Sequence, residues 1–390
     1  MFRGGPRSIH LVSMSTHAKL MRRALELAER GAGRVNPNPL VGAVVVKDGR
    51  IVGEGFHERF GGPHAEVLAL DAAGEEARGA DLYVTLEPCV HWGKTPPCVE
   101  RIISSGIKRV FVAVRDPNPL VNGKGIATLR EAGIAVTEGV LEREARKLNE
   151  PFFKFITTKR PFVILKLALS LDGKVATRSG ESRWISNERS RELVHQMRNR
   201  YAAVLVGVNT ILRDDPQLTA RAAGARDPWR IVLDSRGRIP LEAKVLSLGS
   251  PAPTVVATTE LMPQEKERAL ISKGARVWRL RARDGRVDLE ELLVRLGEEG
   301  LDSLLVEGGP TVAAGFLEAG LVDKVVFFIT PKIIGGEEAP GAVGGRGVEG
   351  LAEAWKLKDI SVRMLEGDLV YEGYLQGGPW RGGPPGATLR

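Results

Sequence analysis

Three side chains that bind zinc well, and one carboxylate close to them in sequence, lie in the first hundred residues. His64, Cys89 and Cys98 offer an imidazole and two thiolates. This set fills three positions of a tetrahedral zinc site and leaves the fourth for water. Glu66 follows the histidine by two positions, where it can carry a proton to and from that water. The residue types predict zinc-assisted hydrolysis.

Two other interpretations of the same residues stay open. The chain has only two cysteines, so Cys89 and Cys98 could form a disulfide, but the first 13 residues show no secretory signal and paired cysteines in such chains more often bind metal. A closed structural zinc site would need a fourth ligand, such as His91 or His57. In that case Glu66 would be an exposed carboxylate favoured by the start of a helix.

The pattern His-x-Glu followed by Pro-Cys resembles the signature of zinc nucleobase deaminases. In these proteins the second cysteine usually follows the first by three positions. Here the interval from Cys89 to Cys98 is nine positions, which argues against the cytidine and nucleic-acid deaminases.

Five motifs of the first half resemble the deaminase domain of the bifunctional riboflavin-biosynthesis deaminase/reductase family, in which the long interval is normal. They are Asn38-Pro-Leu-Val-Gly, His64-Ala-Glu, Tyr83-Val-Thr-Leu-Glu-Pro-Cys89, Gly93-Lys94-Thr-Pro-Pro-Cys98 and Arg115-Asp-Pro-Asn-Pro. The resemblance implies that His64, Cys89 and Cys98 bind zinc and that Glu66 is the acid/base. It also implies that Asn38, His57 and Lys94 hold the diaminopyrimidinone ribosyl phosphate.

Two of these substrate residues have a physical interpretation of their own. Lys94 is a suitable cation for a phosphate, although a solvated loop lysine is the alternative. Asn38 could equally be a turn residue before Pro39.

A glycine-rich turn marks the second half. Glu307-Gly-Gly-Pro-Thr311 follows an apolar stretch and opens a predicted helix, an arrangement that offers backbone N–H groups to a phosphate. It is not the G-x-G-x-x-G fingerprint of dinucleotide-binding folds, so taken alone it could be a plain tight turn.

Further motifs resemble the reductase domain of the same family. They are Lys166-Leu-Ala-Leu-Ser-Leu-Asp-Gly173, Ser182-Arg-Trp-Ile185, Val206-Gly-Val-Asn-Thr210, Asp214-Asp-Pro216 and Leu218-Thr-Ala-Arg221. The resemblance implies a dihydrofolate-reductase-like fold that uses NADPH. It implies cofactor contacts from Ala168, Trp184, Thr210, Asp214, Ser235, Gly309, Pro310, Thr311, Val312, Ala313, Ala314 and Gly315. It implies substrate contacts from Ser182, Arg198, Leu218, Arg221 and Glu307.

Three residues of this half have competing interpretations. Lys166 is a candidate for polarising or protonating the ribose carbonyl, or a strand lysine that pairs with a carboxylate. Trp184 could be simple core packing. Asp172-Gly173 is more typical of a hairpin turn than of a site.

Hydrophobic periodicity and turn residues predict α/β structure throughout. In the first half we expect helices at 16–31, 64–73 and 98–105, a hairpin of strands 41–46 and 50–55, and strands at 82–86 and 109–114. Pro88 and Pro96-Pro97 indicate helix starts at both cysteines. In the second half we expect strands at 162–169, 203–207, 230–234, 254–258, 303–306 and 324–329, and helices at 186–201, 289–298 and 311–317.

These elements predict an α/β sandwich with a mixed sheet in the first half and a separate α/β domain in the second. The family resemblance implies that 15–150 is a zinc-dependent, cytidine-deaminase-like α/β/α sandwich and that 160–375 is an NADPH-dependent reductase domain. A bridge at 148–159 and flexible tails at 1–14 and 377–390 complete the expected organisation.

Composition bounds the remaining function classes. The net charge of +8 is spread thinly, with 21 Lys and Arg against 18 Asp and Glu in residues 1–150, and aromatic residues make up 5%. A nucleic-acid partner would favour concentrated basic and aromatic surface, so we expect small anionic substrates instead.

No apolar run is long enough for a membrane span. The family resemblance implies a cytoplasmic homo-oligomer, dimer or tetramer. A non-catalytic zinc-stabilised binding protein remains the alternative from another class.

Overall fold

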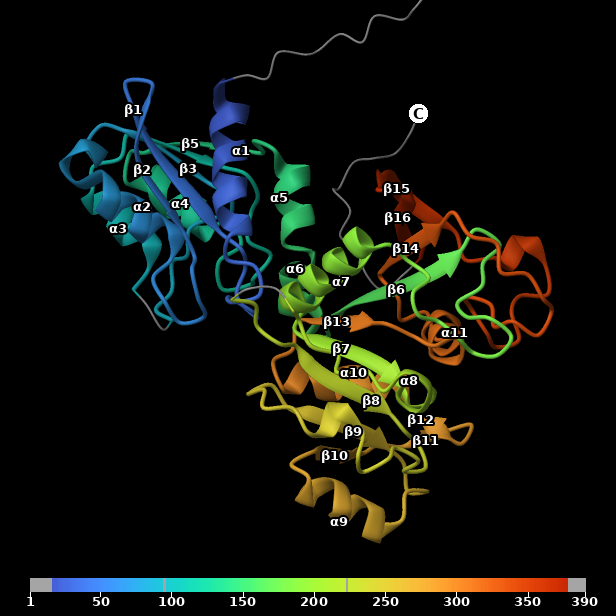
Figure 1. Cartoon of the computed structure of the whole chain (residues 1–390). Coiled ribbons are helices and arrows are strands. Elements are labelled where there is room, and N and C mark those ends of the chain that lie inside the picture. Colours follow the sequence, from blue (N-terminus) through green and yellow to red (C-terminus); the bar gives the residue numbers. More distant parts are fainter. Residues whose placement is uncertain (1–15, 94–95, 222–223, 378–390) are drawn as a thin grey trace, which may run out of the picture. The chain divides into compact units, whose positions relative to one another are not determined.

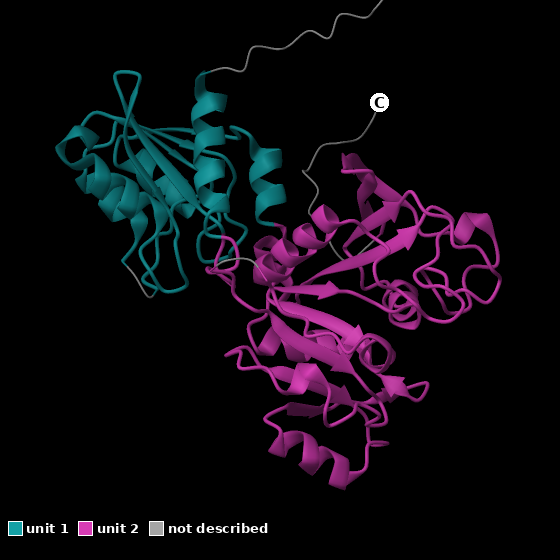
Figure 2. Ribbon diagram, viewed as in Figure 1, with its two compact units in different colours: residues 1–31, 40–149 teal, residues 32–39, 150–390 magenta. Residues whose placement is uncertain are grey.

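The computed structural model describes residues 16–93, 96–221 and 224–377, and the chain divides into two compact units (Figures 1 and 2). Unit 1 comprises residues 1–31 and 40–149, and unit 2 comprises residues 32–39 and 150–390. The expected tails, apart from Gly377, lie outside the described residues. No helix within the described ranges is long and apolar enough to cross a membrane.

Unit 1 is built on a five-stranded mixed sheet in the order β2-β1-β3-β4-β5. The β1–β2 and β1–β3 pairs are antiparallel, whereas β3, β4 and β5 run parallel. The parallel strands therefore end at one edge of the sheet, where a ligand-binding crevice is expected. The strands are β1 (Gly42–Lys47), β2 (Arg50–Phe56), β3 (Asp81–Val84), β4 (Arg109–Val112) and β5 (Ala135–Glu138).

Helices cover both faces of this sheet. A Cβ at Gly42 would lie 1.9 Å from the Ala24 carbonyl of α1, and a Cβ at Gly55 would lie 2.5 Å from the Ala65 carbonyl of α2. Because Gly55 pairs with Ala43, the neighbour of Gly42, the two glycines point to opposite faces. The result is an α/β/α sandwich. Its helices are α1 (Thr16–Glu29), α2 (Ala65–Ala73), α3 (Cys98–Ser104), α4 (Lys124–Glu131) and α5 (Glu142–Leu148).

Unit 2 is built on a nine-stranded sheet in the order β10-β9-β8-β7-β13-β6-β14-β16-β15. The seven strands from β10 to β14 are parallel, and the β16–β15 hairpin adds to β14 in antiparallel fashion. These strands are β6 (Phe162–Ser170), β7 (Ala203–Gly207), β8 (Trp229–Leu233), β9 (Thr254–Thr258), β10 (Arg276–Arg279), β13 (Ser303–Val306), β14 (Lys324–Thr330), β15 (Leu357–Leu365) and β16 (Asp368–Leu375). A small hairpin consists of β11 (Ala282–Arg283) and β12 (Arg286–Val287).

Two hydrophobic cores lie on the two faces of this sheet. One contains Leu292 and Leu296 of α10 with Phe316 of α11. The other contains Met197 of α7 and Ile211 of α8. The strands are apolar on both sides, as expected when helices cover both faces of a parallel sheet. The helices are α6 (Glu150–Thr158), α7 (Glu188–Arg200), α8 (Val208–Asp214), α9 (Gln264–Ser272), α10 (Leu289–Glu298) and α11 (Pro310–Glu318).

The α/β class is confirmed, and every predicted element is present with its ends within two residues of expectation. The helix start predicted at Cys89 is wrong, because residues 87–90 form neither helix nor strand. Pro88 instead lies in the loop that follows strand β3. The predicted bridge is helical, since α5 ends at Leu148 and α6 begins at Glu150.

A buried ion pair anchors α6 within unit 2. The Lys154 ammonium lies 2.5 Å from the Asp323 carboxylate, and the two side chains are 2% and 0% exposed. Asp323 also accepts a hydrogen bond from the Val163 backbone N–H at 2.7 Å. Removal of one buried ion leaves the other uncompensated, which is far more costly than the loss of a surface pair.

We predict that Lys154→Met lowers the free energy of unfolding of unit 2 by about 3–5 kcal/mol. Arg189→Ala is the control, because its pair with Glu192 is about half exposed and should contribute at most about 1 kcal/mol. Denaturant unfolding of the three proteins, followed by circular dichroism, measures the difference. Equal midpoints for Lys154→Met and the wild type would contradict the assignment.

Candidate active sites

The three predicted zinc ligands converge in unit 1. His64 Nδ1 lies 3.1 Å from Cys98 Sγ and 3.6 Å from Cys89 Sγ. His64 is the N-cap of α2, Cys98 opens α3, and Cys89 lies in the loop after β3. Within the described residues, this is the only group of three or more His, Cys, Asp or Glu side chains whose ligand atoms all lie within 4.8 Å of one another. One imidazole and two thiolates at this separation fit a zinc ion.

Cys89 is held as a thiolate by its neighbours. Its sulfur interacts with Cys98, whose backbone N–H donates to it at 3.4 Å, and with His64. The interactions with Cys98 and His64 outweigh the effect of burial and lower the pKa of Cys89 to about 4. No disulfide joins the two cysteines, which contradicts the disulfide alternative. A thiolate is the form that binds metal.

Glu66 is buried, which contradicts the alternative of an exposed helix-start carboxylate. Its side chain is in the first turn of α2, and only 3% of the residue is exposed. Burial raises the pKa of Glu66 above its usual range, although His64 opposes the shift. A carboxyl group with a raised pKa beside a metal site can both accept and return a proton near neutral pH.

His57 is buried next to the metal-binding cluster. Its Nδ1–H donates to the Pro63 carbonyl at 2.9 Å, and its ring meets the His64 ring edge-on with centroids 5.4 Å apart. Burial lowers the pKa of His57 and favours the neutral ring. His57 therefore helps to fix the chain that presents His64. Neither His57 nor His91 joins the group of three ligands within the described residues, so a fourth protein ligand is not present there.

Sequence reasoning missed two carboxylates that support this site. Glu87 is 3% exposed and accepts hydrogen bonds from the backbone N–H groups of Asp116, Gly123 and Ile126 at 2.9–3.2 Å. It thereby ties the loop that carries Cys89 to the start of α4. Burial raises the pKa of Asp116 to about 7. Glu87 lies in the Thr-Leu-Glu-Pro-Cys motif and Asp116 in the Arg-Asp-Pro-Asn-Pro motif, both of which carried the family resemblance. Their place in these motifs was the sequence signal that could have identified them.

The structure does not test the other two predicted deaminase residues. Lys94 falls outside the described residues. Asn38 lies in a turn of unit 2, where its backbone N–H donates to the Val35 carbonyl at 2.8 Å. The Asn36 amide in the same segment donates to the buried Asp302 carboxylate at 2.9 and 3.0 Å.

Unit 2 contains a cavity of about 1530 Å³. Residues that follow the carboxyl ends of β7, β8 and β13 line it, together with Lys166 and Ala168 of β6. Parallel strands end at the same edge of the sheet, so this is the expected position for a ligand crevice. The volume exceeds the roughly 300–1,000 Å³ typical of a single small ligand and leaves room for a cofactor together with a substrate.

A buried charge cluster lies at the wall of this cavity. Arg198 forms a two-pronged pair with Glu307, with N–O distances of 2.6 and 2.8 Å, and Lys166 Nζ lies 3.8 Å from the same carboxylate. Burial alone would raise the pKa of Glu307, but Arg198 and Lys166 lower it to about 2. Burial lowers the pKa of Lys166, which makes its ammonium a better proton donor.

Most predicted reductase residues line this one cavity. Trp184 is 61% exposed within it, so the core-packing alternative is wrong. The lining residues among those predicted are Lys166, Ala168, Ser182, Trp184, Arg198, Thr210, Asp214, Leu218, Arg221, Ser235, Glu307, Gly309, Pro310, Thr311, Val312 and Gly315. Asp172-Gly173 forms the turn after β6, as expected.

Ala313 and Ala314 are not among the residues that line the cavity, and their cofactor contacts stay a prediction. Both belong to α11 and are buried, at 0% and 2% exposure. On a helix only part of each turn faces one side, and these two residues face protein.

The lining residues that were not predicted include His195 and Arg191 of α7. His195 Nδ1–H donates to the Thr219 carbonyl at 3.1 Å, and burial lowers the pKa of the ring. Arg191 lies over the Trp184 ring at 4.6 Å from its centroid. Both belong to α7, one and two turns before Arg198, and this helical spacing was the signal available in the sequence.

Comparison with known proteins assigns a family to this geometry. Residues 14–114 match the model for the cytidine and deoxycytidylate deaminase zinc-binding region, and residues 161–371 match the RibD C-terminal domain. The chain is 47% identical to riboflavin biosynthesis protein RibD of Actinobacillus pleuropneumoniae, over 92% of this chain and 95% of that protein. It is 50% identical to the Aquifex aeolicus RibD, over 90% of this chain and 96% of that protein.

A solved structure is similar to both units of the chain. The diaminohydroxyphosphoribosylaminopyrimidine deaminase/5-amino-6-(5-phosphoribosylamino)uracil reductase of Thermotoga maritima is 43% identical in sequence, with a TM-score of 0.82, and covers 93% of this chain and 99% of its own. The chain belongs to the RibD family of bifunctional riboflavin-biosynthesis enzymes. The predicted deaminase and reductase activities, with zinc and NADPH as cofactors, are confirmed.

We predict that the wild-type protein binds one zinc ion per chain through three side chains. Cys98→Ser should lose the ion, because the site would keep only two strong ligands. His91→Ala is the control and should keep full zinc content. Elemental analysis after dialysis against a weak chelator measures both. Loss of zinc from the His91 variant would instead indicate a closed four-ligand site.

Proposed function

We propose that unit 1 hydrolyses the amino group of 2,5-diamino-6-ribosylamino-4(3H)-pyrimidinone 5′-phosphate, with release of ammonia. The product is 5-amino-6-(5-phosphoribosylamino)uracil. Unit 2 then reduces the ribosyl side chain of this product to ribityl. The two activities for which the Thermotoga maritima relative is named support both assignments. The buried Glu66 beside a three-ligand metal cluster is the single observation that carries the first reaction.

His64, Cys89 and Cys98 hold the zinc, which when bound activates a water molecule for attack on the ring carbon. Glu66 would accept one proton from that water and pass it to the ring nitrogen, and would then carry the second proton of the same oxygen to the amino group, which leaves as ammonia. Its burial keeps the carboxyl group out of bulk water and next to the metal ligands. Asn38, His57 and Lys94 are proposed substrate ligands on the strength of the family's motifs.

In unit 2 the cofactor and the sugar phosphate share the large cavity. Hydride transfer from NADPH places negative charge on the ribose carbonyl oxygen as its carbon is reduced. Lys166, with its lowered pKa, is the proposed donor of the balancing proton. Glu307 orients Lys166 and Arg198, while Arg198 and Arg221 are the proposed contacts to the substrate phosphate.

The glycine-rich turn before α11 supports the proposed cofactor position. A Cβ at Gly309 would lie 3.8 Å from Thr210 Oγ1, so the turn and the start of α8 line the same part of the cavity. Backbone N–H groups at the first turn of α11 can hold the pyrophosphate. Ala168, Trp184, Asp214 and Ser235 complete the proposed cofactor contacts.

The proposal extends to the partners of the chain and its location. We propose that the chain acts as a homo-oligomer, dimer or tetramer, in the cytoplasm, without a nucleic-acid partner. Two free cysteines that serve as metal ligands require a compartment that keeps thiols reduced. The thinly spread charge of +8 supports small anionic substrates over a polyanion.

We predict that Glu66→Gln lowers the rate of deamination by roughly 100-fold or more, since general acid/base groups contribute about 10²–10⁴-fold. The variant should keep its zinc and its reductase activity, because the amide has the same shape as the carboxyl group. Ammonia release and zinc content measure the two properties, with Glu75→Gln as an exposed carboxylate control. Loss of zinc together with unfolding would show that Glu66 is structural.

We predict that Lys166→Met lowers the reductase kcat by roughly 100-fold while NADPH binding is retained, because the lost group acts on the carbonyl during hydride transfer. Lys273→Met, at an exposed position after α9, is the control. NADPH oxidation in the presence of the uracil substrate measures kcat, and fluorescence titration measures binding. A variant that is less stable but has normal kcat would favour the alternative in which Lys166 only pairs with Glu307.

A further inference from the structure

One wall of the reductase cavity is a stretch of chain that belongs to neither helix nor strand. Residues 182–186, here called the wall segment, all line the cavity and lie between strand β6 and helix α7. They include Ser182 and Trp184, both of which are proposed ligand contacts. A segment outside helices and strands lacks their repeated backbone hydrogen bonds, so its position depends on other contacts.

The two ends of the wall segment are anchored separately. At its start, Ser182 Oγ donates to the Asp214 carboxylate at 3.0 Å. Directly after its end, Asn187 forms the N-cap of α7, and its backbone N–H donates to the Asp368 carboxylate at 2.9 Å. These contacts fix residues 182 and 187 and leave the position of the residues between them to further contacts.

Lys332 anchors the middle of the wall segment from outside the cavity. Its ammonium group donates to the Trp184 carbonyl and to the Ile185 carbonyl, each at 2.7 Å. Lys332 is not among the residues that line the cavity. Hydrogen bonds from a charged donor are stronger than those from a neutral one. One ammonium group that binds two successive carbonyls fixes both peptide planes, and with them the direction in which the Trp184 side chain leaves the backbone.

The chain that carries Lys332 is itself braced. It follows strand β14, which pairs with β6 (Figure 1). Beyond the paired strands, the Leu171 backbone N–H donates to the Lys332 carbonyl at 2.7 Å. The Asp172 carboxylate accepts from the backbone N–H groups of residues 334 and 335 at 3.0 and 2.7 Å. Hydrogen bonds from Ser170 and from these two groups lower the pKa of Asp172 to about 2, so the brace stays ionised at neutral pH.

The surroundings of Lys332 separate its effect on position from its effect on stability. Lys332 is exposed, and the oxygens that it binds are neutral carbonyls. Removal of the ammonium group therefore leaves no buried carboxylate without a partner, in contrast to the Lys154 pair, and water can hydrate the two carbonyls. The wall segment should loosen while the remainder of unit 2 stays folded.

We propose that Lys332 is a positioning residue of the reductase, which acts through the wall segment to hold Trp184 and Ser182 toward the ligands in the cavity. The proposal rests on the reductase function proposed above. Displacement of a binding group by about 1 Å, caused by a change remote from the reacting atoms, can lower a rate by roughly 100-fold. Lys332 can therefore affect reduction without contact with the substrate or the cofactor.

Kinetics and hydrogen exchange of Lys332→Met in the full-length, zinc-loaded protein test the proposal. The reductase kcat/KM should fall by roughly 10-fold or more, within the range that misplacement can cause. Backbone amides in a peptide that covers residues 182–187 should exchange roughly 10-fold faster, because this segment opens locally. The rate of deamination by unit 1 and the thermal midpoint should stay at wild-type values. Lys332→Arg should restore most of kcat/KM and of the protection, since a guanidinium group can also donate to two carbonyls.

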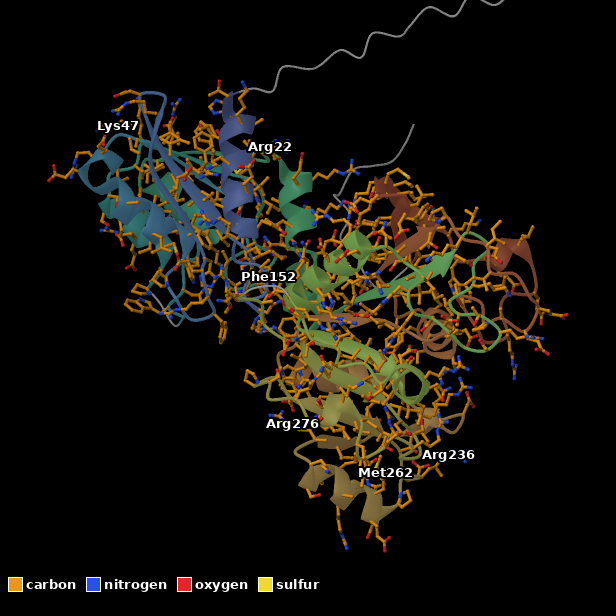
Figure 3. The ribbon with its side chains drawn as sticks, viewed as in Figure 1. Arg22, Lys47, Phe152, Arg236, Met262 and Arg276 are labelled. Carbon is orange, nitrogen blue, oxygen red and sulfur yellow. The ribbon has the colours of Figure 1, made fainter. Side chains whose placement is uncertain are left out.

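Arg276→Met is the matched control, because it also removes an exposed cation beside a tryptophan on the same sheet. Arg276, labelled in Figure 3, lies over the Trp229 ring at 4.7 Å from its centroid and pairs with Glu299. It is not among the residues that line the cavity. This variant should keep the wild-type reductase kcat/KM and the wild-type exchange of residues 182–187.

Two results would overturn the proposal and leave the reductase function in place. In one, Lys332→Met reduces its substrate with normal kcat/KM, whatever the exchange rate of the wall segment. In the other, both activities and the thermal midpoint fall together, which would assign Lys332 a general structural role. Wild-type protein that does not oxidise NADPH with the uracil substrate would instead overturn the reductase function, and this proposal with it.

Discussion

Parallel strands deliver their carboxyl ends to one edge of a sheet, and both reaction centres depend on this constraint. In unit 1 the loop after β3 carries Cys89 and the loop after β4 carries Asp116, so residues 27 positions apart in the sequence support one site. In unit 2 the ends of β7, β8 and β13 contribute the cavity wall, from residues that span about a hundred positions of the chain. The two units share no repeat, yet the same geometry organises both.

Two largely buried glutamates have pKa values shifted in opposite directions by their neighbours. Glu66 is buried beside a metal cluster without a paired cation on the same carboxylate among the described residues, and its pKa rises. The Glu307 side chain is also largely buried, at 7% exposure, but Arg198 and Lys166 lower its pKa to about 2. The first is suited to move a proton, whereas the second stays ionised and orients two cations. One residue type thus serves two tasks through its neighbours.

The sequence predicted the chemistry of each site better than its supporting contacts. The zinc ligands and Glu66 were predictable because residue types and spacing determine metal chemistry. The helix start at Cys89 was wrong because Pro88 suits extended chain as well as a first helical turn. The side chains of Ala313 and Ala314 are buried away from the cavity because contiguous sequence does not share one face of a helix. Glu87 was missed because the backbone groups that it binds lie far from it in the sequence. The β15–β16 hairpin was missed although its pairing is local, because β15 is exposed along most of its length.

The central claim is that one chain performs two ordered reactions in two separate centres. Incubation of the zinc-loaded protein with the diaminopyrimidinone ribosyl phosphate, with and without NADPH, followed by mass spectrometry of the products, tests it most directly. Without NADPH the account predicts a product in which the amino group has been replaced by oxygen. With NADPH this product should also gain two hydrogen atoms. A reduced product that retains the amino group, or an unchanged substrate in the absence of NADPH, would contradict the account.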